Sequence, residues 1–245
     1  MPAIRPYLSS VVTDPRPRTL TASRAVLFDF GGTLDADGQT WKDRVGQLWR
    51  EEGLVVTPER FDPAFYAADD ALVGTVSPTL PFLETVSRLV AGVASGLGLR
   101  DSAVVERIAT RFVTSAMATA RRNAPLLSTL ARRYRLGVVS NFYGNLATVC
   151  DNCGILESFS VVIDSARVAC VKPDPRIFQA AVEALGVSTA EAIFVGDSPS
   201  RDMAGARGVG MPHIWLAAEA SQRRGPCCPG DPVVRSLSDL GALLL

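Results

Sequence analysis

The sequence predicts an α/β fold in which a parallel sheet has helices on both faces and an α-helical subdomain is inserted after the first strand. Two patterns predict this architecture. A short apolar run precedes residue 30, and after residue 135 further apolar runs alternate with helical segments, as expected for right-handed crossovers in a parallel sheet. Between about residues 40 and 122, by contrast, apolar residues recur only with a helical period.

Five short apolar runs are predicted to be strands. Runs of this length, bounded by Gly, Asp or Ser, are typical of strands buried on both faces. The helices between them carry their own start and stop signals: Gly154 ends one, and Asp174-Pro175 and Gly186 bound another. Val233-Val234 and a Leu-rich end close the chain. The predicted strands are residues 24–29, 136–140, 159–163, 192–196 and 212–216.

Four apolar stripes predict four helices in the inserted segment. Thr57-Pro58 supplies an N-cap and a proline at the first helical position of the second helix, and Asp101 or Ser102 opens the fourth. We expect these helices to have a small core of their own. The predicted division is therefore a flexible extension over residues 1–23, a sheet domain formed by residues 24–36 and 124–245, and a helical subdomain over residues 37–123.

Composition excludes several classes of function. The 25 basic and 25 acidic side chains cancel, which argues against a nucleic acid or an anionic membrane surface as the partner. No apolar run approaches the ~20 residues of a membrane span. Prolines near the N-terminus replace the apolar stretch of a signal peptide, so we expect a cytoplasmic protein. The sequence does not indicate an oligomeric state.

The five cysteines are expected to be reduced thiols without a metal or redox role. Five is an odd number, and the chain shows no secretion signal. Cys150 and Cys153 have the spacing of half a zinc site, but the adjacent Cys227 and Cys228 do not supply the other half.

Polar residues stand where the apolar strands end. Asp29, Ser140 and Asp197 each follow such a strand, and Lys172, one of only two lysines in the chain, lies in the loop between the third strand and its helix. Because parallel strands present their carboxyl ends at one edge of a sheet, these four side chains are expected to converge where ligands bind in such folds.

In these four motifs the sequence resembles the haloacid dehalogenase-like superfamily. The motifs occur in the family's order, with spacings of 111, 32 and 25 residues, and cover the chain from about Arg24 to Leu216. The resemblance implies a Rossmann-like sheet and a helical cap between the first and second motifs. It also implies a Mg²⁺-dependent phosphatase or phosphotransferase that acts on a small phosphorylated metabolite through an aspartyl-phosphate.

The resemblance assigns a role to each matched position. Phosphoryl transfer needs alignment and neutralisation of charge, which carboxylates with Mg²⁺ and a lysine provide. Asp29 is expected to be the nucleophile, Ser140 to bind a phosphoryl oxygen, and Lys172 to pair with the nucleophile and the transferring group. The expected Mg²⁺ ligands are Asp29, the backbone carbonyl of Gly31, Asp197 and Asp202, and the expected substrate contacts are Thr33, Asn141, Phe142 and Tyr143.

One position departs from the family pattern. Phosphatases of the family usually carry a second aspartate two residues after the nucleophile, as the general acid and base, and this chain has Gly31 there. General acid–base groups typically contribute ~10²–10⁴-fold in rate. Asp35 and Asp37 are the nearest substitutes, although both also suit a turn.

Two other functions follow from the same motifs. A metal-independent carbon–halogen hydrolase also uses an aspartate nucleophile and lacks the second aspartate, but the two acids Asp197 and Asp202 favour a bound cation. A catalytically inactive phosphate-binding protein would keep the metal pocket and lose turnover with the missing acid.

Overall fold

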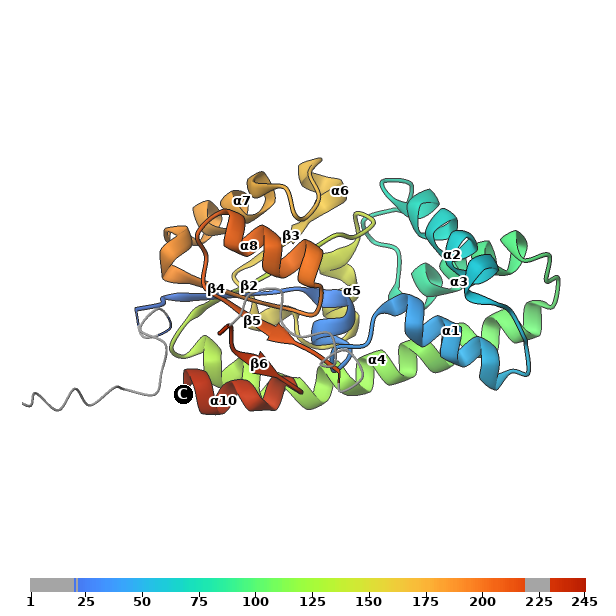
Figure 1. Cartoon of the computed structure of the whole chain (residues 1–245), viewed down its shortest axis with the longest axis horizontal. Helices are drawn as coiled ribbons and strands as arrows, with labels where there is room; N and C mark the ends of the chain where they lie inside the picture. The colour runs from blue at the N-terminus through green and yellow to red at the C-terminus, as the bar shows by residue number, and fades with distance from the viewer. Residues whose placement is uncertain (1–19, 21, 219–229) are drawn as a thin grey trace, which may run out of the picture.

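The structure, a computed structural model, describes residue 20, residues 22–218 and residues 230–245. Most of the predicted N-terminal extension, residues 1–23, lies outside the described residues, as do Cys227 and Cys228. Within the described part, six parallel strands form one sheet in the order β3-β2-β1-β4-β5-β6, with helices on both faces (Figure 1). The predicted fold class is confirmed.

The strands agree with the sequence prediction to within two residues. The third strand begins at Val161 instead of residue 159, because a 3₁₀ turn over Leu156–Ser158 precedes it. Residues 233 and 234 form a short sixth strand at the edge of the sheet, paired with β5. The bounds are β1 Ala25–Phe28, β2 Arg135–Ser140, β3 Val161–Asp164, β4 Ala192–Gly196, β5 His213–Leu216 and β6 Val233–Val234.

Alternate side chains of each strand enter two apolar layers. In β1, Ala25 and Leu27 pack with α7 (Pro175–Leu185) and α8 (Ala204–Gly208) on one face. Val26 and Phe28 join the cluster on the other face, with α4, α5 and α10. These helices are α4 Ser102–Ala131, α5 Leu146–Asn152 and α10 Leu240–Leu244, and the short α6, Ser165–Val168, follows β3. Burial on both faces explains the continuous apolar runs of the strands.

Four helices lie beside the sheet, as predicted (Figure 1). They are α1 Trp41–Glu51, α2 Pro58–Leu72, α3 Phe82–Gly96 and the N-terminal half of α4. Asp101 caps α4 by accepting hydrogen bonds from the backbone N–H groups of Ala103 and Val104 at 3.0 and 3.1 Å. We call α1–α3 and α4 up to residue 123 the helical insert.

The insert differs from the prediction in two respects. The helix α4 runs without a break past residue 123, where we expected a boundary between domains, and has Pro125 inside it. The apolar residues of the insert also do not form a core of their own, because they belong to the cluster that covers one face of the sheet. Aromatic contacts connect the insert to the sheet: between ring centroids, Phe82 of α3 lies 6.1 Å from Phe30, and Trp41 of α1 lies 5.6 Å from Phe142.

Among the described residues, none of the helices combines the length and the hydropathy that crossing a membrane requires.

Candidate active site

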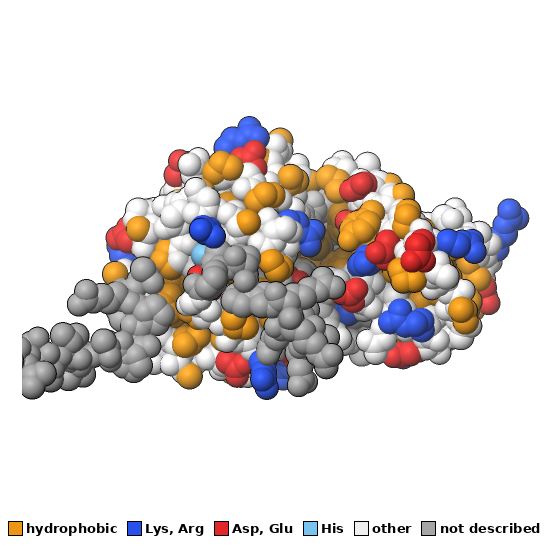
Figure 2. All heavy atoms as spheres, in the orientation of Figure 1, with side chains coloured by type: hydrophobic (Ala, Val, Ile, Leu, Met, Phe, Trp, Pro, Cys, Tyr) orange, Lys and Arg blue, Asp and Glu red, His pale blue; other side chains and the backbone are white. Residues whose placement is uncertain are grey.

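A cavity of about 340 Å³ lies between the carboxyl edge of the sheet and the insert, where the surface is hollowed in Figure 2. Its wall on the sheet side includes the ends of β1 and β2 and the loop before α7. Its wall on the insert side is formed by α1 and α2. The first wall contains Asp29, Ser140, Asn141, Phe142, Lys172 and Arg201, and the second contains Trp41, Lys42, Asp43, Phe65, Tyr66 and Asp69.

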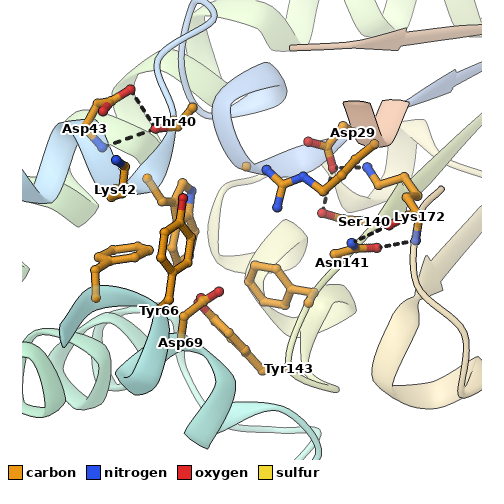
Figure 3. Close-up of a pocket in the computed structure, with 15 residues that line it drawn as sticks. Asp29, Thr40, Lys42, Asp43, Tyr66, Asp69, Ser140, Asn141, Tyr143 and Lys172 are labelled. Atoms are coloured by element: carbon orange, nitrogen blue, oxygen red, sulfur yellow. Dashed lines mark hydrogen bonds and ion pairs between the residues drawn. The ribbon is translucent and has the colours of Figure 1, made fainter. Parts of the chain in front are cut away.

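Asp29 lies at the end of β1, where its backbone N–H donates to the carbonyl of Val195 in β4 at 2.9 Å. Two donors reach the same carboxylate oxygen, Oδ1: the Ser140 hydroxyl and the Lys172 ammonium, each at 2.7 Å (Figure 3). Among the described residues, no hydrogen bond reaches Oδ2. The carboxylate is therefore held in one orientation with its second oxygen available to attack a ligand or to bind a cation.

Lys172 is held in the site by its backbone as well as its ammonium. Asn141 bonds both backbone groups of Lys172: its side-chain oxygen accepts from the N–H at 2.7 Å and its amide donates to the carbonyl at 3.1 Å. Burial lowers the pKa of Lys172, but the charges of Asp202 and Asp29 outweigh this effect and raise the pKa above its ordinary value. Lys172 therefore remains a cation at neutral pH.

Three buried carboxylates form a cluster beside the cavity. Asp29, Asp197 and Asp202 each offer an oxygen within 4.8 Å of the others. Lys172 bonds to Asp202 Oδ1 at 2.7 Å as well as to Asp29. Burial and the charges of Asp29 and Asp202 raise the pKa of Asp197 well above its usual range. A group of hard oxygen ligands with surplus negative charge fits Mg²⁺.

Gly32 allows this cluster to form. Its φ of +95° is a conformation that side chains other than glycine rarely adopt. A Cβ on Gly32 would also lie 2.6 Å from Asp197 Oδ2. The second glycine of the Gly31-Gly32 pair thus lets the backbone approach the carboxylate of Asp197.

Five predicted site residues do not line the cavity, and two of them, Asp197 and Asp202, belong to the carboxylate cluster beside it. Thr33 is fully buried and donates to Asp197 Oδ1 at 3.5 Å, so it contacts the carboxylate cluster. Asp35 is also fully buried. Its carboxylate accepts hydrogen bonds from Trp41 Nε1 at 2.8 Å and from Arg44 Nη1, with which it forms an ion pair, at 2.7 Å. Asp37 pairs with an arginine of α4 at the surface. Neither predicted substitute acid therefore lies on the cavity wall.

Several cavity residues were not among the predicted site residues, and two of them, Arg201 and Asp69, are charged groups that face the site. Arg201 directly precedes Asp202, and its position in that motif is the only signal for it. Asp69 lies on α2, four residues after Phe65 and three before Leu72, so it interrupts the apolar stripe of that helix. An acid within an apolar stripe is the signal that could have identified it.

A sequence profile of the haloacid dehalogenase-like hydrolases matches residues 23–210. The chain belongs to this family. The match spans all four motifs, and the predicted family is confirmed. As a member of the family, the chain is a hydrolase, and the strand-end cluster around Asp29 is the place where the family's motifs meet.

Members of the family that are named for different activities resemble the chain over most of its length. The haloacid dehalogenase-like hydrolase domain-containing protein 3 of Danio rerio is 26% identical, over 90% of this chain and 96% of its own. The phosphoserine phosphatase of Thermus thermophilus is 31% identical, over 80% and 82%. A crystal structure of a dehalogenase is 21% identical and superposes with a TM-score of 0.64, over 91% of this chain and 97% of its own, which supports the fold.

Proposed function

We propose that the chain is a Mg²⁺-dependent phosphatase or phosphotransferase that acts on a small phosphorylated metabolite through an aspartyl-phosphate on Asp29. The observation that carries the proposal is the arrangement of Asp29: two donors hold Oδ1 at 2.7 Å, Oδ2 is left available, and the residue lies on the cavity wall. Relatives named as phosphatases, one for phosphoserine and one for phosphoglycolate, support the choice of a phosphate ester.

The chemistry assigned to the chain proceeds in two displacements. Asp29 Oδ2 attacks phosphorus, and the bond from phosphorus to the ester oxygen breaks. Ser140 and Lys172 orient the nucleophile, and Lys172 also balances charge on the equatorial oxygens of the phosphoryl group. Water then attacks the aspartyl-phosphate and releases inorganic phosphate.

The carboxylate cluster of Asp29, Asp197 and Asp202 would hold Mg²⁺, with the backbone carbonyl of Gly31 as a further ligand. When bound, the ion neutralises charge on the phosphate and on the clustered carboxylates. We therefore expect Mg²⁺ to raise the melting temperature of the protein, and Asp197→Asn to abolish most of that response.

We expect aromatic side chains on both walls of the cavity to contact the substrate. Trp41, Phe65 and Tyr66 face the cavity from the insert, and Phe142 and Tyr143 face it from the loop after β2. Such a lining favours an ester with a compact ring or other apolar body over one with many additional charges.

The test is phosphate release from a broad panel of esters, measured with Mg²⁺ and with EDTA. We expect release that requires Mg²⁺ and that Asp29→Asn eliminates. Equal rates with Mg²⁺ and EDTA, together with an active Asp29→Asn variant, would show the proposal to be wrong.

The dehalogenase alternative makes the opposite prediction about metal. Halide release from 2-haloacids in EDTA, without phosphate release from any ester, would favour it. Several dehalogenases share the fold, but the three clustered carboxylates favour a cation-dependent reaction. A Mg²⁺-dependent thermal shift with a phosphate mimic and no turnover of any substrate would instead indicate an inactive phosphate-binding protein.

A further inference from the structure

A side chain at Gly31 would press against the indole of Trp41. A Cβ on Gly31 would lie 3.2 Å from Trp41 Nε1 and 3.3 Å from Trp41 Cδ1. The indole is fixed in that place because its N–H donates to the buried Asp35 at 2.8 Å. The position two residues after the nucleophile is thus occupied by the edge of an aromatic ring, and a proton for the leaving oxygen has to come from elsewhere.

Asp69 is the carboxylate of α2 that reaches the same cavity as Asp29 (Figure 3). The hydroxyl of Tyr143, in the loop after β2, donates to Asp69 Oδ1 at 2.5 Å. Among the described residues, no hydrogen bond or ion pair reaches Asp69 Oδ2. The tyrosine thus orients the carboxyl group and leaves one of its oxygens free to exchange a proton.

The direction of phosphoryl transfer places the leaving group near Asp69. In an in-line displacement, the attacking and leaving oxygens lie on opposite sides of phosphorus. Asp29 attacks from the sheet side, so the leaving oxygen points toward the insert. Asp69 and Asp29 stand on these two opposing walls (Figure 3).

We propose that Asp69 is the general acid and base of this enzyme, supplied by the insert in place of the carboxylate that Gly31 lacks. The inference rests on the proposed phosphatase function. Two observations support it. Tyr143 fixes one carboxyl oxygen of Asp69 and leaves the other free, and Asp69 lies across the cavity from the nucleophile Asp29.

The proton transfers balance over the two steps. As the bond from Asp29 to phosphorus forms and the ester bond breaks, the carboxyl group of Asp69 gives its proton to the leaving oxygen, and an alcohol departs. Water then attacks phosphorus and gives one proton to the Asp69 carboxylate, while the bond from Asp29 to phosphorus breaks. Phosphate leaves, and both aspartates return to their starting states.

The surroundings of Asp69 raise its pKa, which shifts the carboxyl group toward the protonated form that the first step needs. Burial raises the pKa of Asp69, the charge of neighbouring Asp70 adds to this, and the Tyr143 hydrogen bond and the charge of Arg201 oppose it. Arg201 is also within electrostatic reach of Asp29. Its guanidinium thus connects the two walls electrostatically.

The deciding experiment compares two esters of similar size in Asp69→Asn. An alkyl ester, 2-phenylethyl phosphate, needs a proton on its leaving oxygen, whereas p-nitrophenyl phosphate releases a stable anion. We expect kcat/KM, which reports formation of the phosphoenzyme, to fall ~10²–10⁴-fold for the alkyl ester and less than about threefold for the aryl ester. The phosphoenzyme should also accumulate, visible by mass spectrometry as one added phosphoryl group.

Two further variants complete the test. Asp70→Asn makes the same change on the exposed neighbour of Asp69, whose charge acts on Asp69 only indirectly, and should change both kcat/KM values by less than about threefold. Tyr143→Phe keeps the acid and should give a smaller loss, again confined to the alkyl ester. An equal loss for both esters in Asp69→Asn, or no loss for either, overturns the proposal. If the wild-type protein releases phosphate from neither ester and matches Asp29→Asn, the phosphatase function itself fails and this inference fails with it.

Discussion

The two walls of the cavity are built differently. On the sheet side, Asp29, Ser140 and Lys172 come from strand ends or the loop beside them, and Ser140 and Lys172 each donate to Asp29 at 2.7 Å. On the insert side, three aromatic rings stand among charged side chains, and one of these, Asp69, has one hydrogen-bond partner in the opposite wall. Under the proposed function, the sheet would bind and activate the phosphoryl group, and the insert would select the rest of the substrate and supply the proton.

The largest effect is expected from removing the positive charge of Lys172, on the sheet wall of the cavity. Lys172→Met leaves Asp29 and Asp202 buried without their cation, so we expect a loss of about 3 kcal/mol or more in the free energy of unfolding and ~10²–10³-fold in kcat. Urea unfolding and steady-state kinetics measure the two quantities.

The other lysine of the chain provides the control. Lys42→Met removes a partly exposed ion pair with Asp62 from the insert wall, which should change the free energy of unfolding by at most about 1 kcal/mol. Equal destabilisation by Lys42→Met and Lys172→Met would contradict the difference between the walls.

The second-largest effect is expected from Gly32→Ala, which tests whether the close approach of the backbone to the carboxylate cluster matters. Gly32→Ala strains a backbone with φ of +95° and places a Cβ 2.6 Å from Asp197 Oδ2. We expect about 1–3 kcal/mol of destabilisation and a weaker melting-temperature response to Mg²⁺. Gly98→Ala is the matched control, because Gly98 has φ of +75° but open space around its Cβ. If both variants keep the full Mg²⁺ response, Gly32 does not shape the metal site.

A smaller effect is expected on the insert wall. Tyr66 is half exposed and lines the cavity without contacting Asp29, Ser140 or Lys172. Tyr66→Ala should raise KM about threefold to tenfold through the lost aromatic contact and leave kcat and stability nearly unchanged. A fall in kcat at constant KM would instead place Tyr66 with the reacting groups.

The smallest effect is on the pH dependence of stability. Because burial raises the pKa of Asp69, the folded protein disfavours its charged form more strongly than the unfolded chain does. Above the unfolded pKa the wild-type fold is therefore destabilised relative to Asp69→Asn, and below ~pH 4 both side chains are neutral and the difference disappears. Melting temperatures from pH 3 to pH 8 should show a gain for Asp69→Asn that grows with pH. A gain confined to acid pH would contradict the raised pKa.

The sheet wall could be predicted because its chemistry is local in sequence. Asp29, Ser140 and Asp197 each end an apolar run, and parallel strands bring such ends together whatever the details of packing. The parallel pairing and the family follow from the same patterns, whereas the order of the strands was not predicted. Lys172 could be placed beside them because it lies in the loop that follows the third strand.

The insert wall could not be predicted in the same way. Helical periodicity locates a helix and its buried face, but the rotation and the neighbours of α2 depend on packing against α3 and the sheet domain. The contact between Asp69 and Tyr143 joins residues 74 apart in sequence, and no local pattern encodes it. The predicted boundary at residue 123 falls inside α4, where Asn123 is a buried interior residue, and no local pattern shows that one helix continues across that position.

The continuity of α4 limits how the two walls can separate. A helix of 30 residues, about 45 Å long, belongs to both the insert and the sheet domain, so the insert cannot swing on two slack tethers. Widening the cavity has to flex this helix, and resistance to flexing is lowest near Pro125, where the ring removes a backbone hydrogen bond. We therefore expect a substitution at Pro125 to change how far the cavity can widen, although this residue does not line it.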